Sequence, residues 1–194
     1  MNGKAYTQTV LVKNDPRSPA SATELAAQVA MQKALYDRVN TAWTGYQQVS
    51  TMRATVTPLT KHASADVAKA ATDFDTKLGA IGGPAGNAGR GGGGGAPGGA
   101  PAPPNFRTAH AAQLRQLNSL DTGDLAPNET MTNVFNTTCR DLRTLVTDWT
   151  ALNAKALKDL NAVLAKSNVP AVAMATPALT APTCVAAPAV AAKK

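Results

Sequence analysis

The sequence predicts an all-α protein: an antiparallel bundle of three to four helices, two of them long, with one N-terminal β-strand, a Gly/Pro-rich linker and an extended C-terminal tail. Hydrophobic residues reach 44% while aromatic residues are only 4%, which is typical of close-packed helices rather than of β-sandwiches. Apolar residues recur at steps of three and four in two long stretches. We therefore divide the chain into segments 1–17, 18–81, 82–104, 105–167 and 168–194.

The N-terminal segment alternates its side chains as a β-strand does. This alternation covers residues 5–13 and stops at the Asp15-Pro16-Arg17 turn, and no second strand follows it. A lone strand cannot satisfy its own backbone N–H and C=O groups, so we expect either that the chain is incomplete or that a partner supplies the sheet by β-augmentation. The face expected to dock on that partner comprises Tyr6, Gln8, Val10 and Val12.

A long first helix is predicted after this turn. Ser21 and Glu24 have the spacing of a capping box, so the helix starts near Ala22 and runs to about Val56, a length of roughly 52 Å. We expect its core-facing residues to be Leu25, Val29, Tyr36, Val39, Trp43, Tyr46 and Val49. A second helix is predicted to begin at Thr57-Pro58 and to end at Gly82-Gly83-Pro84.

The second half of the bundle follows the linker at 82–104. A short third helix is expected before the break at Asp121-Thr122-Gly123, and one face of it is predicted to carry Phe106, Ala109, Gln113/Leu114, Leu117 and Leu120. Pro127 then opens a fourth helix of about 39 residues, or ~58 Å. The apolar face of this fourth helix is predicted to contain Met131, Val134, Thr138, Leu142, Leu145, Trp149, Leu152, Ala156, Leu160 and Val163.

The C-terminal tail, from Asn168 onward, consists mainly of Pro, Ala and Val. It has too many prolines for a helix and too few charges for a free tail, so we expect it to lie extended along the bundle. Cys139 and Cys184 are too far apart in sequence for a CxxC metal site, which leaves free thiols or one disulfide. The tail can span ~55 Å and needs about 42 Å to reach Cys139, so a bridge is feasible and would imply an oxidising compartment.

No catalytic, cofactor or metal site is predicted. The chain lacks the G-x-S-x-G and G-x-x-x-x-G-K-[ST] motifs, and His62 and His110 lie on different predicted helices without partners of a metal or general-base site. The aromatic residues at helical spacing are interpreted either as core or as a ligand slot, and they are Tyr36, Trp43, Tyr46 and Trp149.

The net charge of +7 comes from basic residues spread along the chain and interleaved with acidic ones. No basic block carries stacking aromatics, so we predict no nucleic-acid binding and expect docking on an acidic protein face instead. No stretch approaches the ~20 apolar residues of a membrane span, and no signal peptide is recognisable. Any membrane association is therefore expected to be peripheral, on a membrane-bound complex.

Three stretches resemble the C-terminal end of bacterial proteins with BNR or sortilin (VPS10)-type β-propeller repeats, often described as glycosyl hydrolases. They are residues 3–17, 22–36 and 149–161. In that family the last strand of a β-sandwich runs into an Asp-Pro-Arg turn and a helical bundle, so the resemblance implies a bundle and export. The propeller is missing here, and no catalytic residue carries over.

These observations favour a non-catalytic accessory subunit that docks on a larger extracytoplasmic or membrane-bound assembly. Electron-transfer complexes with acidic extracytoplasmic faces are the first assemblies to test. Two other hypotheses stay open: a truncated C-terminal module of a propeller glycosyl hydrolase, and a weak ligand-binding helical module. A periplasmic location is expected, with a cytoplasmic one as the alternative.

Overall fold

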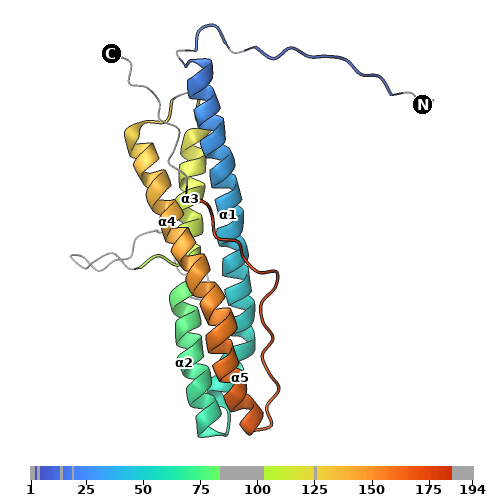
Figure 1. Ribbon diagram of the computed structural model, residues 1–194, viewed down its shortest axis with the longest axis vertical. Coiled ribbons are helices and arrows are strands. Elements are labelled where there is room, and N and C mark those ends of the chain that lie inside the picture. The colour runs from blue at the N-terminus through green and yellow to red at the C-terminus, as the bar shows by residue number, and fades with distance from the viewer. Residues whose placement is uncertain are drawn as a thin grey trace.

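The computed structural model describes residues 3, 5–13, 15–18, 20–83, 103–124 and 126–184, which form an elongated helical bundle (Figure 1). Its elements are α1 (Ala22–Val56), η1 (Thr57–Lys61), α2 (Ala65–Gly82), α3 (Phe106–Leu120), α4 (Glu129–Ala151), η2 (Leu152–Ala156) and α5 (Leu157–Lys166). The predicted all-α class is confirmed. Most of the predicted linker, residues 84–102, and the end of the tail, residues 185–194, lie outside the described residues.

The helices form three columns (Figure 1). One column is α1, another is α4 continued by η2 and α5, and the third consists of α2 and α3 arranged end to end. The third column runs in the opposite direction to the other two and packs against both, since α3 contacts α1 and α4 while α2 contacts α1 and α5. Each half of the bundle thus contains three helices side by side. The half near the start of α1 includes α3, and the other half includes α2.

The helix starts follow the sequence signals closely. Ser21 and Glu24 form the predicted capping box of α1, and Asn105 caps α3 by accepting from the Thr108 N–H. Asn128 caps α4 in the same way. The start of α2 was predicted wrongly: Thr57-Pro58 opens the short 3-10 turn η1, and α2 begins only at Ala65.

The core-facing side of α1 also differs from the prediction. Val49 is buried as expected, but Val29, Tyr36 and Trp43 are 61%, 60% and 46% exposed. The side that faces the bundle carries smaller residues along with aliphatic ones: Ala27, Met31, Leu35, Ala42, Gly45, Val49, Met52 and Val56.

Close approach of α3 explains why small residues line this face. A Cβ atom at Gly45 would lie 2.5 Å from the Phe106 ring, so the ring occupies the space that any side chain at position 45 would fill. Helix axes can approach to the short end of the usual 8–10 Å range only where such residues meet. Val29, Tyr36 and Trp43 are not among the buried residues of this face, and they stay exposed.

The core is divided into two clusters of unequal size. The larger one fills the α2/α5 half and the middle of the bundle, and the smaller one contains Met31, Leu35, Leu120 and Phe135 near the start of α1. Arg38 lies on α1 between Leu35, which belongs to the smaller cluster, and Ala42, which belongs to the larger one. Its guanidinium lies 3.9 Å from the centre of the Phe135 ring and donates to the Phe135 carbonyl at 3.0 Å. Burial lowers the Arg38 pKa to about 10, which leaves it charged at neutral pH.

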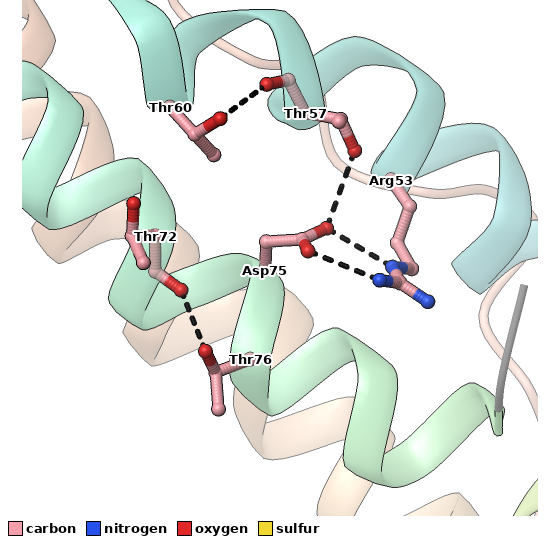
Figure 2. A network of polar contacts seen from close by, with 6 residues as sticks. All are labelled: Arg53, Thr57, Thr60, Thr72, Asp75 and Thr76. Carbon is pink, nitrogen blue, oxygen red and sulfur yellow. Dashed lines mark hydrogen bonds and ion pairs between the residues drawn. The ribbon is translucent and has the colours of Figure 1, made fainter.

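An ion pair fastens α1 to α2 (Figure 2). Arg53 donates to both carboxylate oxygens of Asp75 at 3.0 Å, and the Thr57 hydroxyl lies 3.4 Å from Oδ1 of the same carboxylate. The hydrogen bond from Arg53 lowers the pKa of Asp75 and raises the pKa of Arg53. This two-pronged pair fixes the register of the α1–α2 hairpin.

Candidate functional site

The C-terminal strap, residues 169–184, runs back along the bundle from the end of α5 (Figure 1). Asn168 has a φ of 54°, in the left-handed region that asparagine tolerates, and the Val169 N–H donates to the Leu164 carbonyl at 3.0 Å. These are features of a Schellman-type helix end, which reverses the chain direction. The Val172 side chain is then buried against the larger core cluster.

Two asparagine side chains hold the strap by its backbone. The Asn161 amide accepts from the Val172 N–H at 2.8 Å and donates to the Val172 carbonyl at 2.9 Å. Asn153 makes the same pair of bonds with Ala175, at 2.9 and 3.0 Å. Each amide satisfies both backbone groups of one residue, as a neighbouring strand would. The contact recognises an extended backbone and is indifferent to the side chains it carries.

A π-helical turn brings these two asparagines to the same side of the helix. In a regular α-helix, residues eight apart are about 80° out of phase at 100° per residue. The five residues of η2, Leu152–Ala156, form a wider i→i+5 turn, in which each residue rotates less. The extra residue in this turn compensates for most of the offset between Asn153 and Asn161. The π-helical turn that interrupts the predicted fourth helix therefore allows both asparagines to bond the strap.

Gln48 lies on α1 and joins the strap to both α1 and α4. Its amide N–H donates to the Pro177 carbonyl at 2.7 Å, and its amide oxygen accepts from the Trp149 indole N–H at 2.9 Å. Trp149 is only 1% exposed, so it belongs to the core rather than to a ligand slot. The bonds of Gln48 satisfy a buried indole and a strap carbonyl together.

A disulfide closes the strap at its far end. Cys139 on α4 is bonded to Cys184, with 5.7 Å between their Cα atoms, so the predicted bridge is confirmed. The bond joins residues 45 apart in sequence and encloses the end of α4, η2, α5 and the strap in one covalent ring.

The N-terminal segment, residues 5–13, is held by none of these devices. Tyr6, Val10 and Val12 are 90%, 78% and 87% exposed, and Gln8 is exposed as well. The predicted strand is not confirmed: these residues pair with no other strand, because no segment among the described residues offers them a sheet edge. Beyond them, the Arg17 side chain bonds the Asp15 carboxylate at 2.9 Å and lowers its pKa.

The outer stripe of α1, defined by Val29, Tyr36 and Trp43, is a second exposed apolar feature. The Trp43 ring stacks on Tyr46 at 5.5 Å between ring centres and lies 5.3 Å from the ring of His110 on α3. Burial lowers the pKa of His110 and so favours its neutral imidazole. Of the four aromatic residues considered above, the structure thus brings Trp43 and Tyr46 together and places Trp149 elsewhere, in the core.

The described residues contain no cluster of side chains suited to holding a metal ion. No group of three or more His, Cys, Asp and Glu side chains gathers among them. His62 accepts a hydrogen bond from the Ser64 N–H at 3.1 Å, a local bond just before α2. In the part of the chain that the structure covers, no helix is both long and apolar enough to cross a membrane.

No protein-family model, curated protein or solved structure matches this chain. The resemblance to BNR and sortilin-type proteins therefore stays a prediction. Three features of the molecule bear on what this protein does: the strap with its disulfide, the N-terminal segment and the outer stripe.

The residues that hold the strap were missed by sequence reasoning. Asn153 and Asn161 are eight apart and look out of phase unless the π-helical turn is known. Gln48 looks like an ordinary polar position at the edge of a long helix. The available signal was the tail itself, since an extended apolar segment needs side chains that satisfy its backbone.

Proposed function

We propose that this protein is a non-catalytic accessory subunit that docks on a larger extracytoplasmic or membrane-bound protein assembly through residues 5–13. One observation carries the proposal: this segment exposes Tyr6, Val10, Leu11 and Val12, each at least 76% accessible, while its backbone has no sheet partner among the described residues. Large exposed apolar side chains on an extended chain are typical of a segment that becomes ordered on binding.

A sheet edge is the partner surface that suits such a segment. An added strand forms main-chain hydrogen bonds with the edge, and alternate side chains enter pockets on one face. Tyr6, Gln8, Val10 and Val12 would form that face. The net charge of +7 favours an acidic surface around the edge, since opposite charges accelerate encounter and fix orientation.

The disulfide supports the extracytoplasmic part of the proposal. Structural disulfides persist in oxidising compartments and are rare where thiols are kept reduced. The Cys139–Cys184 bond holds the strap in place and thus has a structural role. An electron-transfer complex with an acidic extracytoplasmic face is the first assembly that we would test.

Proline substitutions test the docking mode. In a strand added to a sheet edge, the N–H groups of alternate residues point at the edge, and proline removes that donor. We expect one of Gln8→Pro and Thr9→Pro to abolish co-purification of a stoichiometric partner from native membranes, and the other to reduce it much less. Equal loss from both, or binding that survives both, contradicts β-augmentation. A full-length chain that recovers no stoichiometric partner contradicts the proposed function itself.

A further inference from the structure

The outer stripe of α1 has a seven-residue repeat. Val29, Tyr36 and Trp43 are seven residues apart and exposed. The same side of the helix carries four half-buried residues, each three or four positions from a stripe residue: Leu25, Gln32, Val39 and Tyr46. This alternation of three and four is the a/d pattern of a coiled coil, sustained over three heptads. The repeat therefore fits a second helix lying along α1.

We propose that this second helix is α1 of another copy of the chain, running antiparallel. In an antiparallel pair each a residue faces a d residue of the partner, so the sequence numbers of facing residues have a constant sum. With a sum of 75, Val29 faces the partner's Tyr46, and Tyr36 faces the partner's Val39. In the layer between these two, Gln32, whose amide also donates to the Leu120 carbonyl at 3.1 Å, faces the partner's Trp43. Every one of these layers combines one aromatic side chain with one smaller side chain.

This matching of sizes favours the antiparallel over the parallel orientation. A parallel pair in register would place Trp43 on the partner's Trp43 and Val29 on the partner's Val29. One layer would then be wide and the other narrow, whereas two straight helices pack at one interaxial distance of about 8–10 Å. The antiparallel pair has layers of similar width throughout. Both orientations give an isologous two-fold interface, so the match of side-chain sizes is what distinguishes them.

The charges beside the stripe are compatible with self-pairing. Lys33 and Asp37 flank Tyr36, and their charged atoms lie 4.0 Å apart, so this part of the face has no net charge. The partner residues opposite Lys33, at positions 40–44, include no charged side chain. The whole chain carries +7, and two copies repel at long range, so added salt should strengthen the dimer by screening this repulsion.

The exposed area predicts a small interface. A buried aromatic side chain covers 150–250 Å², so Tyr36 and Trp43, about half exposed, would each contribute roughly 100 Å². Leu114 on α3 is 38% exposed. It lies near the level of Tyr36, because α3 runs antiparallel to α1 from Phe106 beside Gly45. A standard interface covers about 800 Å² per partner, so this interface is below the standard size and we expect a weak, transient dimer.

Sedimentation of the full-length chain over a range of concentrations tests the dimer. We expect a monomer–dimer equilibrium in the parent chain and at least tenfold weaker association in Tyr36→Glu. Ala30→Glu is the matched control, since Ala30 is exposed and lies roughly 120° around α1 from Tyr36. Circular dichroism should show both variants folded. A parent chain that stays monomeric at several hundred micromolar, or equal association of all three, overturns the proposal.

Spin labels test the orientation. Because Cys139 and Cys184 are bonded to each other, a label attaches only to a new cysteine. In the antiparallel dimer, labels at Lys33→Cys should lie about 13 Å apart along the axis, and labels at Ala26→Cys about 35 Å apart. Two short distances would indicate a parallel pair and overturn the proposal. Residues 5–13 are intact in every variant, so this outcome is independent of docking by the N-terminal segment.

Discussion

The two extended segments of this chain differ in how their backbones are satisfied. The strap lies on the bundle, where the amides of Asn153, Asn161 and Gln48 bond its N–H and C=O groups and a disulfide closes its end. Residues 5–13 also carry large apolar side chains, namely Tyr6, Val10, Leu11 and Val12, yet they bond none of the described residues. Hydrophobic side chains alone therefore do not order an extended segment on this bundle. Backbone partners decide which segment is fixed.

The largest effect that separates the segments should come from the disulfide. Cys184→Ser, or reduction of the parent chain, opens the ring between these two residues, which are 45 apart in sequence. The unfolded chain then regains loop entropy worth about 4 kcal/mol of stability on the chain-entropy model. Urea unfolding with and without reductant measures this loss. An unchanged unfolding midpoint in Cys184→Ser would show that the bridge does not hold the strap.

Removal of one amide should have the next largest effect. Asn161→Ala leaves the Val172 N–H and carbonyl without their partner, which should cost about 1–3 kcal/mol. Hydrogen exchange at the Val172 amide should accelerate markedly. Asn40→Ala, on the exposed surface of α1, is the control and should change neither quantity. Equal protection of Val172 in both variants would contradict the interpretation that Asn161 holds the strap by its backbone.

Low pH should weaken the α1–α2 hairpin while sparing the hydrogen bonds that Asn153 and Asn161 make to the strap. Asp75 has a folded-state pKa below its usual value, so its contribution is complete above about pH 4 and is lost as pH falls further. We expect about 0.5–1 kcal/mol from this pair, and its pH dependence should vanish in Asp75→Asn. The amides of Asn153 and Asn161 do not titrate. Selective loss of Val172 protection at pH 3 would contradict this division.

Deletion of residues 1–13 should have the smallest effect on stability. The described residues of this segment contribute no packing to either core cluster, so the free energy of unfolding should change by less than about 0.5 kcal/mol. Thermal and urea unfolding of the shortened chain measure this change, and partner binding should be lost in the same protein. A loss of more than 1 kcal/mol would mean that the segment packs on the bundle after all.

Local signals in the sequence predicted the parts of the fold that depend on neighbouring residues. Ser21 and Glu24 specify the start of α1 through bonds within one turn. The spacing of Cys139 and Cys184, combined with the length of the tail, sufficed to predict a feasible bridge. Such features could be predicted because their physical cause lies within a short stretch or in a simple limit on reach.

Features that depend on distant segments could not be predicted in the same way. The buried face of α1 depends on how closely Phe106 approaches Gly45, and a rule that places large apolar residues in the core selects the wrong face there. The hydrogen bonds of Asn153 and Asn161 to the strap depend on the turn at η2, which changes the position of Asn161 around the helix relative to Asn153. The outer stripe has a sequence pattern typical of a core and is exposed for the same reason.

The covalent ring closed by Cys139 and Cys184 also determines how the molecule would carry mechanical load. Tension applied between the start of α1 and a point beyond residue 184 would pass from Cys184 directly to α4. The end of α4, η2, α5 and the strap would then lie off the load path, since a taut covalent shortcut leaves the chain inside the ring slack. A tether attached at both ends of this protein would therefore stretch the α1, α2 and α3 segments before it disturbed the strap.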